Sequence, residues 1–302
     1  MNATLPLVSV CIPAYNGRFF GEALESALAQ TWPALEVVVC DDSPGSDIEG
    51  MARSRADARV RYVRNPRRLG FHGNFSRCLE VAGGEYIKYL NDDDRLRPRC
   101  VETLATILRT NPGVRLAASR RIVIDAQGRP GQDILPTTPI SHVSALMFGR
   151  DLGDFLLANG VNFLGEPSTG LFRRADLAVE DGVVFRWGGH DYHCLADMAL
   201  WLRLLAQGLA YYDAGVLSEF RVHEGQEQQG MDYECVLERL WIARQARAAG
   251  FLGTTALWRA ALSAVAGRAK AMRDEPAYEA ATRARAGEVF EEALAELQAL
   301  PG

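Results

Sequence analysis

The sequence lacks the features that mark several large classes of protein. Its 33 lysines and arginines are outnumbered by 38 aspartates and glutamates, so the net charge of −5 leaves no basic surface for nucleic acid. No apolar run is long enough to span a bilayer. The N-terminus also lacks a basic segment followed by a long apolar stretch, which is the pattern of a signal peptide. We therefore expect a cytoplasmic globular protein that does not bind nucleic acid.

Cysteine is scarce and scattered. No two of the six cysteines form a C-x-x-C pair, so their spacing indicates neither a zinc site nor a disulfide framework. Most of them lie inside apolar runs, where a reduced thiol behaves as a small hydrophobic side chain. We expect buried free thiols in a reducing cytoplasm. The six are Cys11, Cys40, Cys78, Cys100, Cys194 and Cys235.

Glycine-rich phosphate-binding motifs are also missing. A dinucleotide-binding fold needs G-x-G-x-x-G directly after its first strand, whereas the first strand-like run here, residues 8–12, leads into the segment PAYNG. The segment GFHG at residues 70–73 resembles neither this fingerprint nor a P-loop. A nicotinamide-dependent enzyme is therefore disfavoured.

What the first part of the chain does have is an alternation of strand and helix patterns. Short β-branched or alternating runs predict strands, and apolar residues at a spacing of four, as in Phe20, Leu24 and Leu28, predict helices between them. Such an alternation predicts a parallel sheet covered by helices on both faces. The predicted strands are residues 8–12, 35–40, 59–63, 86–90 and 116–124, and further helices are predicted at 74–81 and 98–108.

The second half of the chain is irregular at first and helical later. Residues 127–159 are rich in glycine, proline, threonine and serine, and we expect them to be irregular. A helix is predicted from about residue 191, followed by two short strands at 211–212 and 216–217. From residue 233 onward the pattern is helical throughout. Glycine and proline divide this last part into three helices, at Gly250, Gly253 and Pro276.

Polar side chains follow three of the predicted strands at the point where each strand ends. The segment PAYN follows the first, Asp41 and Asp42 follow the second, and three consecutive aspartates at 92–94 follow a later one. Because open parallel sheets bind ligands outside the carboxyl ends of their strands, we expect these groups to converge on one crevice. Adjacent carboxylates repel each other unless a cation joins them, and a hard divalent cation is the usual partner. A solvated acidic turn that caps the next helix is the alternative.

Several single residues have both a structural and a functional interpretation. Tyr15 could pack in the core or stack on a nucleotide base. Asp41 and Asp42 could end a strand at a turn, or accept hydrogen bonds from a base or a ribose. Asn74 could cap a helix or lie in the site. Asp197 could interact with the dipole of its own helix, or act as a general base at the rim of the crevice.

Taken in order, these segments resemble the family 2 glycosyltransferases of GT-A fold, a group of inverting enzymes that use nucleotide sugars. The resemblance spans residues 7–225. It implies an α/β protein with a Rossmann-like, mostly parallel sheet, helices on both faces and a C-terminal helical extension. It also implies a catalytic domain at 1–230, with a nucleotide-binding half at about 1–125 and an acceptor half at about 126–230, followed by a helical region at 231–302. The strings that carry it are VSVCIPAYNG, ALAQTWPALEVVVCDDSPGSD, NPRRLGFHGNFSRCLEVAGGEYIKYLNDDDRL, GEPSTGLFRR and ADMALWLRLLAQG.

The resemblance also assigns roles to individual residues. Asp197 would be the catalytic base, and the segment GEPS at 165–168 would lie on the acceptor side. Asn91 stands where the family usually has the first aspartate of its motif, which leaves open whether Asp93 or Asp94 binds metal directly; we favour Asp93. The residues implied to bind the nucleotide are Pro13, Ala14, Tyr15, Asn16, Asp41, Asp42, Asn74 and Asp92, and those implied to bind metal are Asp93, Asp94 and His223, the last of which could also be a surface histidine.

The chemistry implied by the family is a single displacement with Mn²⁺ or Mg²⁺ as cofactor. A sugar would move from a nucleoside-diphosphate donor to a hydroxyl group of a sugar, a lipid-linked acceptor or a small molecule, in the biosynthesis of polysaccharide, lipopolysaccharide or glycoconjugates. A nucleotidyltransferase that makes nucleotide sugars and a non-catalytic nucleotide-sugar binding partner are the alternatives. The C-terminal helices could cap the catalytic domain or form a homodimer contact. Their arginines, with Trp241 and Trp258, would also suit a peripheral contact at the inner face of a membrane.

Overall fold

The computed structural model of the protein describes residues 4–224 and 232–301. Its internal contacts divide the chain into two compact units. The first, which we call the sheet unit, comprises the described residues up to Met147 together with Phe163–Val184 and Gln207–Glu224. The second, which we call the helical unit, comprises Phe148–Asn162, Phe185–Ala206 and the described residues from 232 onward. The predicted division at residue 230 stays a prediction.

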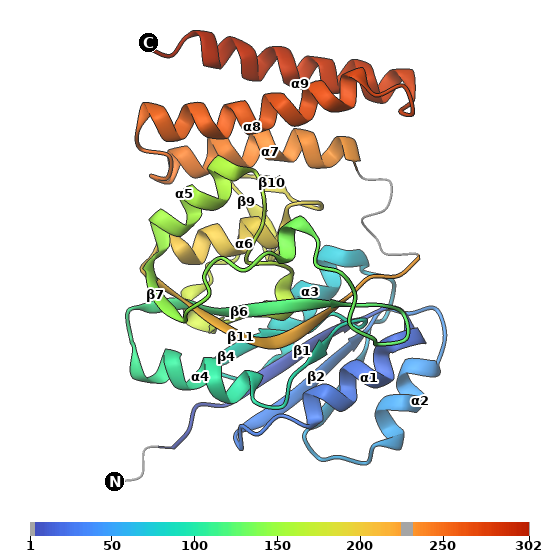
Figure 1. The fold of residues 1–302 in the computed structure, drawn as a ribbon. Coiled ribbons are helices and arrows are strands. Elements are labelled where there is room, and N and C mark those ends of the chain that lie inside the picture. The colour runs from blue at the N-terminus through green and yellow to red at the C-terminus, as the bar shows by residue number, and fades with distance from the viewer. Residues whose placement is uncertain (1–3, 225–231, 302) are drawn as a thin grey trace. The chain divides into compact units, whose positions relative to one another are not determined.

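The sheet unit is organised around one large sheet. Its strands are β1 (Val8–Ala14), β2 (Leu35–Asp41), β3 (Val60–Arg64), β4 (Tyr86–Tyr89), β5 (Arg95–Leu96), β6 (Val114–Ile124), β7 (Ala145–Phe148), β8 (Gly170–Arg173) and β11 (Leu209–Arg221). The order across the sheet is β3-β2-β1-β4-β8-β6-β11-β5, and β7 pairs with β11 (Figure 1). Strands β1 to β4 run parallel to one another, as does β11 to β6, whereas β8 lies antiparallel between β4 and β6 and β5 pairs antiparallel with β11. The mostly parallel sheet expected from the sequence is therefore present, with an antiparallel strand inside it.

Helices cover both faces of this sheet. Alternate residues of a strand point to opposite faces. On one face Val10 and Ile12 of β1 share a buried cluster with Phe20 of α1 and Leu104 of α4. On the other face the Sγ of Cys11 lies 3.9 Å from the Cys78 carbonyl oxygen of α3. The helices of this unit are α1 (Gly17–Leu28), α2 (Asp47–Ser54), α3 (Gly70–Val81) and α4 (Cys100–Thr110), with 3₁₀ turns at η1 (Leu135–Thr137), η2 (Pro167–Thr169) and η3 (Arg174–Asp176).

Two sequence-based expectations need correction. The short strands expected at 211–212 and 216–217 are one strand, β11, whose register against β6 shifts between Asp213 and Val216. That irregularity breaks the sequence pattern without ending the strand. The segment 127–159 is also not irregular throughout, because it contains η1, β7 and the helix α5 (Gly149–Asn159). Gly160, in the left-handed conformation with φ of 61°, terminates α5.

The helical unit contains α5 and four further helices. The three C-terminal helices expected from the positions of Gly250, Gly253 and Pro276 are confirmed as α7 to α9. Thr254 begins α8 with a side chain that accepts a hydrogen bond from the Leu257 N–H. In the part of the chain that the structure describes, no helix is long and apolar enough to cross a membrane. The remaining elements are β9 (Arg186–Trp187), β10 (His190–Asp191), α6 (Ala196–Leu205), α7 (Asp232–Ala248), α8 (Thr255–Asp274) and α9 (Ala280–Gln298).

The expectation that all cysteines are free thiols is wrong for two of them. Cys194, just before α6, and Cys235, on α7, form a disulfide with a Cα–Cα distance of 5.1 Å. They are 41 residues apart in the sequence, so no local motif predicts the disulfide. Beside them the buried Glu238 carboxylate accepts hydrogen bonds of 2.7 Å from the His193 and Leu195 N–H groups. The segment before α6 is thus held to α7 at two points. The other four cysteines are free and buried.

Because all six cysteines lie among the described residues, alkylation of the unfolded protein can test this pairing. Protein purified without reductant and alkylated in denaturant should take up label at four cysteines, and at all six after reduction. The Cys235→Ser variant should label at each of its remaining cysteines without reduction. Six labels on unreduced wild-type protein, read by intact mass, would contradict the disulfide.

Candidate functional site

The carboxyl ends of the central parallel strands meet at one edge of the sheet, as the sequence predicts. Ala14 at the end of β1 is in register with Asp41 at the end of β2. The Asp92 carboxylate, just beyond β4, accepts hydrogen bonds from the backbone N–H groups of Tyr15 and Asn16 at 2.7 and 2.8 Å. The segments after β1 and β4 are therefore joined by a side chain that the sequence assigns to nucleotide binding. The Asn16 side chain in turn caps α1 by accepting from the Arg18 N–H.

A cavity of about 540 Å³ opens beside these strand ends. Tyr15 presents an exposed ring to it, and the Arg68 guanidinium lies 4.8 Å from the centre of that ring. Pro13 and Ala14 are buried within β1 and do not line the cavity. Sequence reasoning missed the three arginines in this wall, although the segment RNPRR that directly follows the third strand carries them all. The cavity is lined by Tyr15, Asp41, Asp42, Ser43, Pro44, Arg64, Asn65, Pro66, Arg67 and Arg68.

Asp41 lines this cavity and forms a hydrogen-bond network with charged and hydroxyl groups. Its carboxylate accepts from the Tyr62 hydroxyl at 2.6 Å and from Arg64 at 2.7 Å, and from the Ser43 N–H at 2.8 Å. Burial raises the pKa of Asp41, but the hydrogen bonds from these three residues outweigh it and leave the pKa below its usual range. Burial and the neighbouring carboxylate raise the pKa of Tyr62 to about 12. Asp41 is thus ionised and Tyr62 protonated at neutral pH.

Asp42 and Asn74, both assigned to nucleotide binding, are buried and bond to the protein itself. The Asp42 carboxylate accepts from the Asn65 amide at 2.9 Å and from the Leu69 and Gly70 N–H groups at 2.8 Å. The Asn74 amide accepts from the Asn65 side chain at 2.9 Å and donates to the Ala14 carbonyl at 3.2 Å. These contacts hold the 65–70 segment and the start of α3 against the end of β1. Contact with a nucleotide stays a prediction for both.

The three consecutive aspartates face three different environments. Asp93 directs Oδ2 to His223 Nε2 at 3.2 Å, and its side chain is 23% exposed. Burial raises the pKa of Asp93, and the contact with His223 opposes that rise. The His223 ring also packs on Phe19 with 4.8 Å between ring centres. Two of the three residues assigned to a metal are therefore brought together from positions 130 residues apart.

Asp94 does not fit its predicted role as a metal ligand. It is fully buried, and its Oδ2 accepts from the Ser168 hydroxyl at 2.6 Å and the Asn91 amide at 3.2 Å. Its Oδ1 accepts from the Arg221 N–H at 3.0 Å. Burial and the nearby carboxylates raise the pKa of Asp94 well above its usual value. Protein donors engage both oxygens, so this residue joins the end of β4 to η2 and β11.

Asp93 Oδ2 and His223 Nε2, which are in hydrogen-bond contact, have a separation that two neighbouring ligands of a divalent cation would also have. Neighbouring ligands of an octahedral Mg²⁺ with bonds of about 2.1 Å lie roughly 3 Å apart, close to the separation of these two atoms. Among residues 4–224 and 232–301, no group of three or more His, Cys, Asp or Glu side chains has an arrangement that could hold a metal ion. A cation here would therefore need ligands beyond these two side chains, and Mg²⁺ usually keeps several waters in its shell.

Asp197, the predicted base, lies in the first turn of α6 in the helical unit. Its Oδ1 accepts from the Met198 N–H at 2.7 Å. Residues 193–195, directly before α6, are held by the Glu238 carboxylate and by the disulfide. Its predicted role as general base stays a prediction.

The family model for glycosyl transferase family 2 matches residues 9–178, more than half of the chain. The chain belongs to this family. The match includes the cavity, the three aspartates and the GEPS segment, so the sequence-based identification of the family is confirmed.

Curated relatives agree with the family. An uncharacterized protein of Mycobacterium tuberculosis is 36% identical over 212 residues, which is 68% of this chain and 64% of that protein. A Campylobacter jejuni GalNAc(5)-diNAcBac-PP-undecaprenol β-1,3-glucosyltransferase is 32% identical over 104 residues, covering 33% of this chain and 34% of its own length. The chain thus spans less than two thirds of each of these relatives.

The fold has a counterpart among solved structures. The crystal structure of S. aureus TarS in complex with UDP-GlcNAc matches with a TM-score of 0.56 and 14% identity, over 95% of this chain and 71% of that chain. At this identity the likeness concerns the fold, and it supports the GT-A assignment: a mostly parallel sheet with surrounding helices and a C-terminal helical extension.

Replacing Asp42 with alanine should destabilise the protein, because three donors lose their acceptor and two of these are backbone N–H groups. We expect the free energy of unfolding to fall by about 2–4 kcal/mol. Asp47→Ala, an exposed aspartate in the first turn of α2, is the matched control and should cost less than about 1 kcal/mol. Urea unfolding measures both. Equal midpoints for the two variants would show that Asp42 does not hold the 65–70 segment.

Proposed function

We propose that the protein is an inverting glycosyltransferase that moves a sugar from a nucleoside-diphosphate donor to a hydroxyl group. One observation carries the proposal. A cavity with an exposed tyrosine is linked to the Asp93–His223 pair through Asp92: the Tyr15 N–H donates to the Asp92 carboxylate, and Asp92 directly precedes Asp93. The cavity suits the base of a nucleotide sugar, and the Asp93–His223 pair suits its diphosphate with a bound metal. The base and the diphosphate are likewise neighbouring parts of a nucleotide sugar, joined by the ribose.

The donor would bind with its base against the Tyr15 ring, since an aromatic face accepts a planar ring well. Arg64, Arg67 and Arg68 would place positive charge along the same wall, and arginine is well suited to phosphate recognition. The likeness to TarS bound to UDP-GlcNAc supports a donor of this kind. Asp93 and His223 would hold Mn²⁺ or Mg²⁺, which supplies Lewis-acid stabilisation of the departing diphosphate.

Asp197 would act as the general base. It removes the proton from the acceptor hydroxyl as the hydroxyl oxygen forms a bond to the anomeric carbon. The bond from that carbon to the diphosphate oxygen breaks on the opposite side, so the configuration inverts and the nucleoside diphosphate leaves. A lipid-linked acceptor is favoured, because relatives such as the Campylobacter jejuni enzyme are named for undecaprenol-linked acceptors. Assembly of a polysaccharide or glycoconjugate is the corresponding pathway, and a peripheral membrane contact remains part of this proposal.

Incubation with a panel of nucleotide sugars and Mn²⁺ should release a nucleoside diphosphate from at least one donor by slow hydrolysis. Excess chelator should abolish this release, and Asp93→Ala should lower it together with metal-dependent donor binding, while Asp47→Ala should leave both unchanged. Release of pyrophosphate would instead favour a nucleotidyltransferase, and binding without turnover would favour a non-catalytic partner. Unchanged turnover in excess chelator would refute the metal.

Asp197→Asn should keep donor binding and lose most of the transfer activity. A positioned base contributes about 10²–10⁴ in rate, so we expect a loss of that size in kcat. Isothermal calorimetry with the donor identified in the panel, alongside the transfer assay, separates binding from chemistry. Transfer within a few-fold of the wild type, with normal donor binding, would remove Asp197 from the role of base.

A further inference from the structure

The end of β11 carries an arginine that the mechanism above does not use. The Arg221 side chain is fully buried, a costly place for a positive charge unless it is paired and hydrogen-bonded. It lies two residues before His223 and directly beside the turn that carries Asp93. It therefore lies close to both proposed metal ligands.

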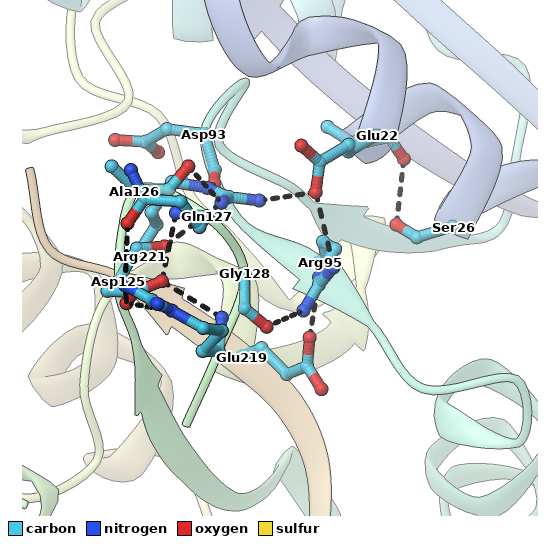
Figure 2. A network of polar contacts seen from close by, with 12 residues as sticks. Glu22, Ser26, Asp93, Arg95, Asp125, Ala126, Gln127, Gly128, Glu219 and Arg221 are labelled. Atoms are coloured by element: carbon cyan, nitrogen blue, oxygen red, sulfur yellow. Dashed lines mark hydrogen bonds and ion pairs between the residues drawn. The ribbon is translucent and has the colours of Figure 1, made fainter. Parts of the chain in front are cut away.

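Arg221 contacts three separate segments at once (Figure 2). Its Nε donates to the Asp93 carbonyl at 2.7 Å, and its Nη1 donates to the Asp125 carbonyl at 3.1 Å. Its Nη2 pairs with Glu22 on α1 at 2.7 Å. The guanidinium also lies 4.3 Å from the centre of the Phe19 ring, the same ring on which His223 packs. Only a planar group with several fixed donors can serve all of these partners together.

The backbone of the same residue completes the connection. The Arg221 N–H donates to the Asp94 carboxylate at 3.0 Å, so both the main chain and the side chain of Arg221 bind the 93–94 turn. Beyond this double attachment, His223 Nε2 reaches Asp93 Oδ2 at 3.2 Å. The distance between the two ligand atoms depends on how β11 ends against the turn. The pairing of β5 with β11 holds the strand just before this end, and Arg221 makes the contacts with the 93–94 turn itself.

We propose that Arg221 is a positioning residue that sets the separation of Asp93 and His223 for a divalent cation, with Glu22 holding its guanidinium in place. The inference rests on the proposed function, because it assumes that these two side chains bind the metal. Residues that orient metal ligands from behind typically change metal affinity by about 10- to 100-fold when they are replaced. Lysine at this position keeps a positive charge, but its single ammonium group cannot bond to the Asp93 carbonyl and to Glu22 with the two separate nitrogens that arginine provides.

The network offers a matched control. Arg95 also pairs with Glu22, at 3.2 Å (Figure 2). Its other hydrogen bonds go to Glu219 and to the Gly128 carbonyl, where Arg221 bonds to the Asp93 carbonyl instead. Arg95→Lys therefore perturbs the same set of ion pairs while leaving in place the hydrogen bonds of Arg221 to Asp93 and Asp94. A purely structural role for Arg221 predicts that the two lysine variants behave alike.

The test measures Mn²⁺ affinity directly, by the loss of the electron paramagnetic resonance signal of free Mn²⁺ on titration with protein. Arg221→Lys should weaken Mn²⁺ binding about 10- to 100-fold, and Arg95→Lys should change it by less than about twofold. Glu22→Gln, a near-isosteric change at a half-exposed residue, should weaken binding to an intermediate extent. Urea midpoints for every variant report on the fold.

The outcomes separate this inference from the proposed function. Wild-type affinity retained by both Arg221→Lys and Glu22→Gln would overturn the positioning role while leaving the metal site intact. Equal weakening by Arg221→Lys and Arg95→Lys would overturn it in favour of a general structural role. If the wild type binds no Mn²⁺ either alone or with a nucleoside diphosphate present, the metal in the proposed function fails, and this inference fails with it.

Discussion

Hydrogen bonds from protein donors to the carboxylates at the strand ends are the interactions on which the rest of this site depends. Acidic side chains gathered at one sheet edge would repel each other and lose hydration, so each needs a donor. Asp92 accepts a hydrogen bond from the backbone beyond β1, and Asp42 accepts from the 65–70 segment. Asp94 accepts from Ser168 and Arg221. Asp93 is the exception within the triplet, because its side chain meets an imidazole. The same bonds that make these charges tolerable also join the loops that form the cavity.

The different hydrogen-bond partners of these carboxylates explain which parts of the site can be predicted from the sequence. The strands, their order along the chain and the meeting of their polar ends follow from the alternation of patterns and the geometry of parallel sheets. Whether a given carboxylate binds a ligand or holds the fold together cannot be predicted in this way. That role depends on which hydrogen-bond donors reach the carboxylate from segments distant in the sequence. Asp94 looks like a metal ligand in the sequence, and only the fold brings Ser168 and Arg221 to its oxygens. The antiparallel strand β8 is hidden for the same reason, since its neighbours lie far away in sequence.

The helical unit shows a similar limit. Its three last helices are visible in the sequence because glycine and proline separate long helical patterns. The disulfide between Cys194 and Cys235, and the two hydrogen bonds to Glu238, join segments more than 40 residues apart and leave no local signal. Together they hold the residues immediately before α6, the helix whose first turn contains Asp197. The C-terminal helices are thus not merely an appendage, because α7 fixes the start of a helix that carries a candidate catalytic group.

Buried anchoring groups also change how a loss of function in this protein should be interpreted. Asp42 and Asn74 hold the wall of the cavity through Asn65, so the order of that wall and its affinity for a ligand are linked. A ligand that binds only the ordered wall stabilises it in proportion to its affinity and concentration. Removing an anchor therefore weakens binding even where the anchor never touches the ligand. Arg221 extends the argument from the cavity to the Asp93–His223 pair. Its buried charge loses hydration, and its ion pair with Glu22 and its hydrogen bonds to the Asp93 and Asp125 carbonyls offset that loss, so replacing any of these partners disturbs the turn that carries Asp93.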